Sequence, residues 1–281
     1  MATAAVEPFT LFSLQVTRTR RLGPSLVRVT FDGADLKGFH SDGRDQSLSL
    51  FLPHPGQKEP VVPRDLGAAW WQEYRELPED VRAVMRSYTL RELRREPDEI
   101  DIDFALHGVE PGAATPAGPA SQWAARAVPG DRVLVLGPVL ADNRAIRFRP
   151  PEDTDLVVMW GDETAVPAAT AILESLPAGT RVRAWLQVPH PGDIQDVRTD
   201  ADAEITWLVR GEGAPEPLTA LQSAQLPDAA HPYIWIAGES GQVKALRRHF
   251  VRDRGVDRRR VTFVGYWRRG LSEEQLRATG E

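Results

Sequence analysis

The sequence predicts a two-domain β + α/β protein, in which an antiparallel β-barrel is followed by a doubly wound parallel sheet. Three observations support this. The first half consists of short apolar runs separated by turns, whereas apolar runs alternate with helical patterns in the second half. The character changes after Arg149-Pro150-Pro151, and 281 residues are enough for two modest cores. We therefore expect domains at residues 1–150 and 151–281.

Six runs in the first half have the length and apolar content of strands, and several of them alternate between apolar and polar residues. They are residues 11–22, 25–31, 46–52, 86–92, 99–108 and 131–137. Turn dipeptides such as Gly23-Pro24, Asp42-Gly43 and Pro129-Gly130 separate them. The stretch from Arg64 to Val84 has helical spacing and is expected to be an excursion between strands. Such a series of short strands predicts an antiparallel barrel.

The second half alternates between strand and helix patterns, which predicts a parallel sheet. Five apolar runs are suited to strands buried on both faces. They are residues 155–160, 181–188, 204–209, 233–237 and 261–265. Helical spacing is found in residues 161–177 and 240–255, and Ser272 and Gln275 form a capping-box pattern for a C-terminal helix.

Two turns of the second half contain glycine and acidic residues at comparable positions. WGDETA (160–165) ends the first predicted strand of the sheet, and IAGES (236–240) ends the fourth. Ligands of open α/β sheets bind outside the carboxyl ends of the strands, so these turns indicate a cofactor crevice. Neither turn is a G-x-G-x-x-G fingerprint, which argues against a standard dinucleotide site. Tight strand-to-helix turns that need glycine for backbone reasons would give the same pattern.

Composition excludes several classes of function. The chain has no cysteine, so disulfides, thiolate-bound iron–sulfur clusters and a catalytic thiol are excluded, and any redox chemistry requires a bound cofactor. The net charge of −6 argues against a general nucleic-acid binder. The sequence MATAAVEPFT lacks the pattern of a signal peptide, and no apolar run approaches the length of a membrane span. We therefore expect a cytoplasmic protein that does not bind membranes.

The charge is unevenly distributed along the chain. Ten Lys or Arg and two Asp lie between Lys244 and Arg269, a local charge of +8, so the rest of the chain carries −14. A basic zone on an acidic protein suggests a local anionic ligand. A solvated helix face rich in arginine is an equally good explanation.

The segment MRSYTLRE (85–92) combines a cation, an aromatic ring and a hydroxyl within four positions. In a strand, Arg86 and Tyr88 point to one face and Thr89 turns away or lies at the end. One planar, negatively charged ligand would use all three side chains: the ring on Tyr88, a phosphate on Arg86 and a polar ring atom on Thr89. An ordinary half-exposed strand with a surface arginine is the alternative.

This combination of a barrel carrying R-x-Y-T and an α/β domain with glycine turns resembles the ferredoxin–NADP reductase superfamily. Five longer segments resemble, in order, the siderophore-interacting protein family of flavin-dependent ferric reductases. They are DIDFALHG (101–108), GPASQWAARAVPGDRVLVLGP (118–138), GDETAVPAATAILESLP (161–177), IWIAGESGQVKALRRHF (234–250) and VGYWRRG (264–270).

The resemblance implies that the barrel binds FAD and that the second domain binds NADH or NADPH. Arg86 matches the arginine that contacts the pyrophosphate, Tyr88 the tyrosine against the isoalloxazine ring, and Thr89 the residue near flavin N5. A helix beginning near Gln122 or Trp123, capped by Ser121, would offer N–H groups to the pyrophosphate. The remaining implied FAD-binding residues of the barrel are Ser87, Asp103, Phe104, Ala105, His107, Gly108, Pro119, Ala120, Ser121 and Trp123. Packing in the core is the alternative role for Trp123.

In the second domain, the resemblance implies two groups of residues on the nicotinamide side and two aromatic residues from the last strand, and the basic zone suggests a substrate-binding pair. Gly161, Asp162, Glu163 and Thr164 form one group, Gly238 and Glu239 lie opposite, Tyr266 and Trp267 come from the last strand, and Arg268 and Arg269 are expected to bind substrate. Gln187 departs from the family, which more often has an acidic residue there, and this weakens a preference for NADH. Arg210 is a candidate partner for a 2′-phosphate or a plain surface arginine.

The resemblance therefore implies a reductase that passes electrons from NAD(P)H, or from ferredoxin, through FAD to iron(III) held by a siderophore. No protein metal site and no catalytic acid or base is needed, because the flavin carries the chemistry. A general NAD(P)H:flavin or ferredoxin-type reductase with another acceptor would have the same motifs. A non-catalytic flavin- or siderophore-binding module is the third alternative.

Overall fold

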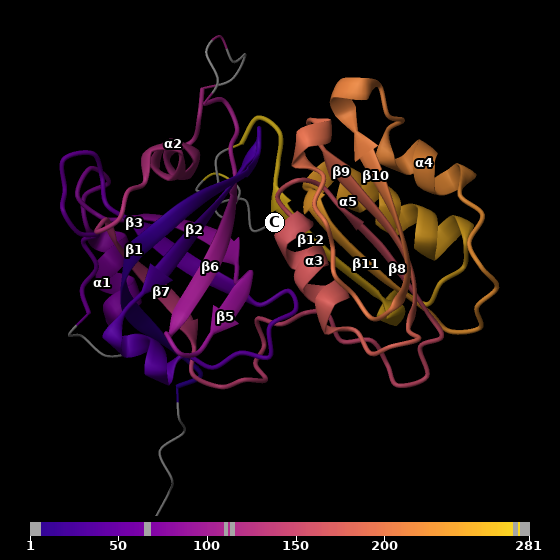
Figure 1. Ribbon diagram of the computed structural model, residues 1–281, viewed down its shortest axis with the longest axis horizontal. Helices are drawn as coiled ribbons and strands as arrows, with labels where there is room; N and C mark the ends of the chain where they lie inside the picture. Colours follow the sequence, from indigo (N-terminus) through magenta and orange to yellow (C-terminus); the bar gives the residue numbers. More distant parts are fainter. Residues whose placement is uncertain (1–6, 65–68, 110–111, 113–115, 272–274, 276–281) are drawn as a thin grey trace, which may run out of the picture. The chain divides into compact units, whose positions relative to one another are not determined.

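The computed structural model describes the chain apart from residues 1–6, 65–68, 110–111, 113–115, 272–274 and 276–281. The chain forms two compact units (Figure 1). The first comprises Met1–Arg21, Val27–Asp42 and Gln46–Ala145, and the second comprises Leu22–Leu26, Gly43–Asp45 and Ile146–Glu281. Two short segments from the first half of the sequence thus belong to the second unit.

The first unit contains the predicted antiparallel barrel. Its seven strands follow the order β4-β3-β7-β1-β2-β6-β5 in one sheet. They are β1 (Phe9–Gly23), β2 (Leu26–Asp32), β3 (Ser47–Leu52), β4 (Val84–Thr89), β5 (Glu92–Arg94), β6 (Glu99–Ala105) and β7 (Arg132–Pro138). The run predicted at 86–92 is divided between β4 and β5, because the chain leaves one edge of the sheet and joins the other.

One helix covers the inside of the barrel sheet and another lies on a separate small core. Helix α2 (Pro119–Arg126) packs Trp123 and Ala124 against Phe31 and Phe104 of the main core. Helix α1 (Trp70–Glu76) is the predicted excursion between β3 and β4, and its Tyr74 packs on Phe51. Helix α2, which belongs to the same unit, therefore contributes side chains to the barrel core.

The second unit contains a five-stranded parallel sheet, as predicted. Its order is β10-β9-β8-β11-β12. The strands are β8 (Leu156–Gly161), β9 (Arg181–Val188), β10 (Asp202–Val209), β11 (Pro232–Glu239) and β12 (Val261–Trp267). From β8 the chain continues to β9 and β10 on one side of the sheet, and then returns to add β11 and β12 on the other side of β8. This is the switch point at which doubly wound sheets bind their ligands.

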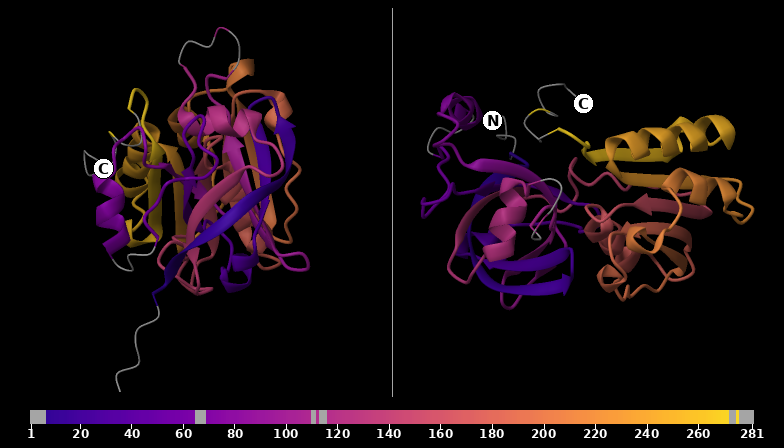
Figure 2. Two further views of the ribbon diagram at one scale, coloured as in Figure 1. Left: turned by 90° about the vertical axis from the view of Figure 1, so that its left-hand side faces the viewer. Right: turned by 90° about the horizontal axis from the view of Figure 1, so that it is seen from above.

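Helices cover both faces of this sheet (Figure 2). Helix α3 (Val166–Ser175) packs with the β8 side chains Val157 and Met159, whereas Leu156, Val158 and Trp160 face the opposite layer. That layer contains α4 (Pro217–Ser223), which the sequence analysis missed, and α5 (Ser240–Arg248). Each central strand is apolar on both faces for this reason.

Two of the five strands differ from the prediction that all are buried on both faces. β10 and β12 have partly exposed side chains along their length, including Phe263 with 43% exposure. Both lie at the edges of the sheet, where the helices cover them incompletely. The capping box Ser272–Gln275, which predicts the start of a C-terminal helix, lies outside the described residues apart from Gln275 itself. Within the described part of the chain, no helix is long and apolar enough to cross a membrane.

Candidate functional site

The R-x-Y-T segment lies on β4, at one edge of the barrel sheet. Arg86 is paired with Leu50 of β3 and Tyr88 with Leu48, so both side chains share the face of the buried core. The Tyr88 ring lies 4.4 Å from the Phe104 ring, centroid to centroid. Arg86 Nη1 donates to the Met85 carbonyl at 2.8 Å. The Arg86 guanidinium and the Tyr88 ring, which packs against Phe104, therefore lie two residues apart on one face of β4.

The start of α2 supplies backbone N–H groups in the same unit, although the helix begins earlier than predicted. It begins at Pro119 with Gly118 as N-cap, because proline is well suited to the first helical position. Its first described intrahelical bond runs from Gln122 N to Gly118 O, which leaves the N–H groups of Ala120 and Ser121 ahead of it. This is an arrangement that favours an anion such as a pyrophosphate.

Ser121 does not cap the helix, contrary to the prediction. It is the third helical residue, and its hydroxyl donates to Ala105 O at 3.1 Å and accepts from His107 N at 3.4 Å. Ser121 thus ties the start of α2 to the end of β6. Gly108 follows with a φ of 69°, a conformation that glycine adopts without strain.

Three residues of β6 that the family resemblance implicates in FAD binding are held in the barrel. Asp103 forms a two-pronged ion pair with Arg28, with N–O distances of 2.7 and 2.8 Å. Phe104 is fully buried in the core, and Ala105 contributes its carbonyl to Ser121. The side chains of Asp103 and Phe104 therefore stabilise the sheet. Only the backbone atoms of these residues are available to contact a cofactor.

At the switch point of the second unit, Asp162 connects the ends of three strands. Its Oδ1 accepts from Thr164 N at 3.0 Å and from Thr164 Oγ1 at 2.5 Å. Its Oδ2 accepts from Glu239 N and from Trp267 Nε1, both at 2.8 Å. The burial of the carboxylate, together with the nearby charge of Glu163, raises the pKa of Asp162 to about 6, although the hydrogen bonds from Thr164, Trp267 and Glu239 act in the opposite direction.

Two glycines allow this close packing. Gly238 has a φ of 138°, and a Cβ there would lie 2.6 Å from the Asp162 carboxyl carbon. A Cβ on Gly265 would lie 2.4 Å from Ser240 Oγ, which instead donates to Trp267 O at 3.0 Å. The predicted turns at Gly161–Thr164 and Gly238–Glu239 are thus brought together, with Trp267 between them in the hydrogen-bond network.

The buried carboxylate of Glu163 is paired with Arg210. Two N–O distances of 2.7 Å form a fork between the guanidinium and the carboxylate, and Glu163 is only 2% exposed. Burial lowers the pKa of Arg210, but the hydrogen bonds and charge of Glu163 outweigh it and hold that pKa above its usual value. A 2′-phosphate would therefore have to compete with Glu163 for Arg210. Gln187 is buried, with 2% exposure.

The end of β12 carries the remaining predicted residues. Tyr266 packs against the core on the α3 side of the sheet, and Trp267 is half-buried on Asp162. Arg268 and Arg269 are exposed, and Arg269 N donates to Glu239 Oε1 at 3.4 Å. Glu239 also caps α5 by accepting from Gln242 N at 2.9 Å. Arg247 of the basic zone lies over the Phe263 ring at 4.3 Å, so it is more than a solvated arginine.

Several residues that build these sites were missed by the sequence analysis. Ser240 positions Trp267, Arg28 neutralises Asp103, and the second unit recruits Asp45 from the first half of the chain. Asp45 accepts from the N–H groups of Arg147, Phe148 and the Trp235 indole. Asp45 lies in the turn before β3 and Ser240 is the first residue of α5, and no local pattern in either segment identifies their partners.

Comparison with known proteins gives the family. Residues 15–142 match the domain described as "Siderophore-interacting FAD-binding domain", and residues 154–270 match "Siderophore-interacting protein". The chain belongs to the siderophore-interacting protein family. Its barrel unit accordingly corresponds to the FAD-binding half of that family. The hydrogen-bond donors of Arg86 and of the start of α2 are suited to the pyrophosphate of FAD.

Two curated relatives and one solved structure illustrate the likeness. "Ferric vibriobactin reductase ViuB" of Vibrio cholerae is 31% identical over 93% of this chain and 90% of that protein. "NADPH-dependent ferric-chelate reductase" of Escherichia coli is 33% identical over 90% of this chain and 91% of its own length. The crystal structure of the siderophore-interacting protein SipS from Aeromonas hydrophila has a TM-score of 0.74 at 32% identity, covering 97% of this chain and 99% of that one.

Proposed function

We propose that the protein is a FAD-dependent reductase of ferric siderophores that takes its electrons from NAD(P)H. The observation that carries the proposal is that the Arg86–Tyr88 face falls within the half that matches the FAD-binding domain, in a chain whose second half matches the rest of the family. The relatives named above are reductases of ferric vibriobactin and of ferric chelates.

The barrel residues bind and orient the cofactor in this proposal. Arg86 and the N–H groups of Ala120 and Ser121 hold the pyrophosphate, because a guanidinium and a helix start are complementary to it. Tyr88 lies against the isoalloxazine ring, in the orientation that its contact with Phe104 fixes. Ser87, Thr89, His107 and Gly108 complete the flavin surroundings.

The second unit binds the nicotinamide nucleotide at its switch point. The turn Gly161–Thr164 and the residues Gly238 and Glu239 line this site, and Asp162 holds them in place. Tyr266 and Trp267 supply aromatic surface at the end of β12. When bound, FAD would supply the redox chemistry, which takes two electrons from NAD(P)H and delivers one to each of two iron(III) ions.

Reduction itself releases the metal, because the hard oxygen ligands of siderophores hold iron(III) far better than iron(II). The protein therefore needs no iron ligand and no acid or base of its own. We further propose that Arg268 and Arg269 attract anionic ferric chelates and that the reaction takes place in the cytoplasm, where NAD(P)H is available. Ferredoxin is the alternative donor, and its use is tested in the same assay as NADH and NADPH.

Turnover measurements test the proposal against its two alternatives. Iron(II) formation from ferric siderophores, followed with an iron(II)-specific chromogenic chelator, should be faster than reduction of free flavin, quinones or a redox protein. Preference for one of the latter would assign a general flavin or ferredoxin-type reductase. Flavin binding without any turnover would assign a non-catalytic module.

The proposed role of the arginine pair has its own test. Arg268→Gln with Arg269→Gln should raise KM for an anionic ferric chelate several-fold at low salt and leave KM for a neutral chelate unchanged, because screening weakens only the charged encounter. An equal rise for both chelates would show that the pair does not act by charge.

A further inference from the structure

The carboxyl ends of β8, β9 and β10 lie at one edge of the parallel sheet, and β9 lies between the other two strands (Figure 1). The turn at residues 161–164 follows β8, Pro189 follows β9 and Arg210 follows β10. Gly211 N donates to Pro189 O at 2.9 Å, so the end of β10 lies directly beside the end of β9. In doubly wound sheets that bind dinucleotides, the residues near the end of the second strand recognise the ribose 2′ position. This edge is therefore placed to distinguish a 2′-hydroxyl, as in NADH, from the 2′-phosphate of NADPH.

The fork between Arg210 and Glu163 joins the turn after β8 to the end of β10, on either side of β9. Both terminal nitrogens of the guanidinium lie 2.7 Å from a carboxylate oxygen. The Glu163 side chain is 2% exposed, whereas that of Arg210 is 40% exposed, so the carboxylate is buried beneath its cation. A 2′-phosphate would have to share Arg210 with Glu163 or displace it. Displacement would separate a buried carboxylate from its cation, which is strongly unfavourable.

Carboxylates outnumber the guanidinium at this edge. Burial lowers the pKa of Arg210, but the hydrogen bonds and charge of Glu163, together with the charges of Asp162 and Glu216, hold that pKa above its usual value. Three carboxylates thus act on one guanidinium. A phosphate monoester brings a charge of about −1.5 to −2 at pH 7. The edge therefore repels a 2′-phosphate, whereas a 2′-hydroxyl carries no charge and is not repelled.

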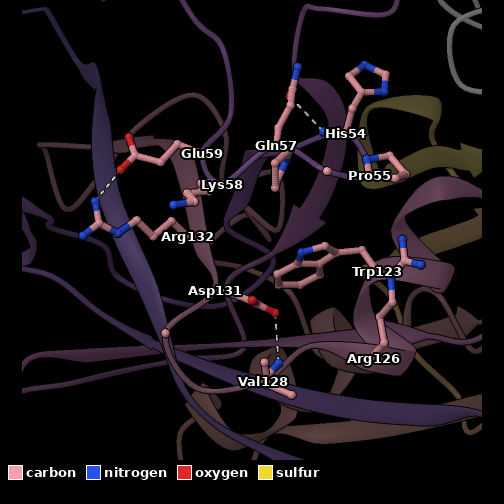
Figure 3. Close-up of a pocket in the computed structure, with 13 residues that line it drawn as sticks. His54, Pro55, Gln57, Lys58, Glu59, Trp123, Arg126, Val128, Asp131 and Arg132 are labelled. Carbon is pink, nitrogen blue, oxygen red and sulfur yellow. Dashed lines mark hydrogen bonds and ion pairs between the residues drawn. The ribbon is translucent and has the colours of Figure 1, made fainter.

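This acidic balance is local, because the barrel unit contains a surface with the opposite balance. A cleft of about 770 Å³ is lined by Lys58, Arg126 and Arg132 together with Glu59 and Asp131 (Figure 3). Cations outnumber carboxylates among these five residues, although the chain as a whole has a net charge of −6. The excess of carboxylates around Arg210 is therefore a property of the sheet edge and does not follow from the overall charge.

The end of β9 does not itself attract either form of the ribose. Gln187 stands where an acidic residue could bind a ribose hydroxyl, but it is 2% exposed and its side chain is not accessible to a nucleotide. His190 is exposed beside Gly211, whose Cβ, if present, would lie 3.8 Å from the His190 Nδ1 atom. A preference at this edge therefore has to come from an unfavourable interaction with one of the two donors.

We propose that the Glu163–Arg210 fork makes the protein prefer NADH to NADPH by disfavouring the 2′-phosphate. Glu163 is the specificity-determining residue, because it neutralises the guanidinium that would otherwise bind the phosphate. Arg210 is the latent phosphate-binding group, and removal of the Glu163 charge would make it available. The inference rests on the proposed nicotinamide site at the switch point and names the donor that this site selects.

Steady-state kinetics with both donors test the inference. The full chain loaded with FAD reduces ferric citrate at pH 7.5, and kcat/KM is determined for NADH and for NADPH. The wild type should have a kcat/KM about tenfold or more higher with NADH. Glu163→Gln should raise the ratio of NADPH to NADH values about tenfold, because one charge-assisted contact is gained. The double variant Glu163→Gln with Arg210→Gln should lose this gain, because the guanidinium is gone.

Matched variants separate this role from effects on folding and from other groups. Glu204→Gln removes another glutamate that is paired with an arginine between β9 and β10, with Arg183 Nε at 3.0 Å, and should leave the ratio unchanged. His190→Ala should change it less than twofold. A partly unfolded variant would lower both rates equally, so the ratio reports specificity alone.

Binding calorimetry with 5′-AMP and 2′,5′-ADP isolates the 2′-phosphate without any turnover. The wild type should bind 5′-AMP more tightly than 2′,5′-ADP, and Glu163→Gln should reverse this order. Preference of the wild type for NADPH and 2′,5′-ADP, an unchanged order in Glu163→Gln, or a gain that persists in the double variant would each overturn the inference. Absence of turnover with both donors would instead contradict the proposed function, and the order of binding of the two nucleotides would still decide the inference.

Discussion

Asp162→Asn tests the hydrogen-bond centre at the ends of the parallel strands. The carboxylate accepts four hydrogen bonds from Thr164, Glu239 and Trp267. An asparagine can accept with its oxygen from Glu239 N and Trp267 Nε1 and donate to Thr164 Oγ1, but the Thr164 N–H then loses its acceptor. That loss costs about 1–3 kcal/mol. The variant also no longer buries a charged carboxylate, which favours its folded state.

The size of the charge effect follows from the pKa of Asp162, which is raised from 3.8 to about 6. The shift corresponds to about 3 kcal/mol that charged Asp162 costs the folded state above pH 7. Because the folded pKa lies above the unfolded one, the folded state binds the proton more tightly. Wild-type stability is therefore gained as the pH falls through 6 toward 3.8. Between pH 7.5 and pH 5.0 this gain is about 1 kcal/mol.

Urea unfolding of the wild type and Asp162→Asn at the two pH values measures this gain directly. Titrating groups that do not interact with Asp162 cancel in the difference between the two proteins, whereas its interaction with Glu163 is part of the measured effect. We expect the variant to lie within about 2 kcal/mol of the wild type at pH 7.5. At pH 5.0 its free energy of unfolding should fall about 1 kcal/mol further below that of the wild type. A difference that stays constant with pH, or that shrinks at pH 5.0, would refute the assignment of a buried, charge-disfavouring site to Asp162.

Three further predictions follow from the same contacts. Gly238→Ala should destabilise the protein by about 1–3 kcal/mol and lower its thermal unfolding midpoint. Gly179→Ala, at a φ of 80° with nothing within 4 Å, is the control that shows the backbone strain alone. A similar thermal shift in both would mean that the Asp162 contact is unimportant. Arg210→Ala should lower the free energy of unfolding in urea by about 1–2 kcal/mol, which is less than for a fully buried pair because the Arg210 side chain is 40% exposed. Arg210→Lys should recover part of this loss. Full stability of the alanine variant would refute the pairing. Ser121→Ala should cost about 1 kcal/mol by leaving Ala105 O without its donor, and calorimetry showing no change would remove Ser121 as the tie between α2 and β6.

The fold was predictable where a local pattern determines burial. β8 and β11 have continuous apolar runs because helices cover both of their faces, and the polar turns after them were correctly placed at one end of the sheet. β10 and β12 have similar apolar runs, yet they are edge strands. Edge position depends on the order of strands in the sheet, which a single strand's sequence does not encode.

The site was predictable as a set of residues but not as a set of partners. Gly118-Pro119 is a helix-start signal that the sequence analysis did not use, which is why α2 was expected to begin only near Gln122 or Trp123. The fork between Glu163 and Arg210 joins residues 47 positions apart, and the Asp162–Trp267 bond joins residues 105 apart. Such contacts depend on the topology of the whole sheet, whereas Arg86 and Tyr88 are related by strand periodicity alone.

Anaerobic rapid-mixing spectroscopy tests the central claim most directly. The protein loaded with FAD is mixed first with NADPH, NADH or reduced ferredoxin and then with two equivalents of a ferric siderophore. Bleaching of the flavin absorbance by one of the donors, followed by its full return as two equivalents of iron(II) appear, is the predicted result. A flavin that no donor bleaches, or a reduced flavin that the ferric siderophore leaves colourless, would contradict the account.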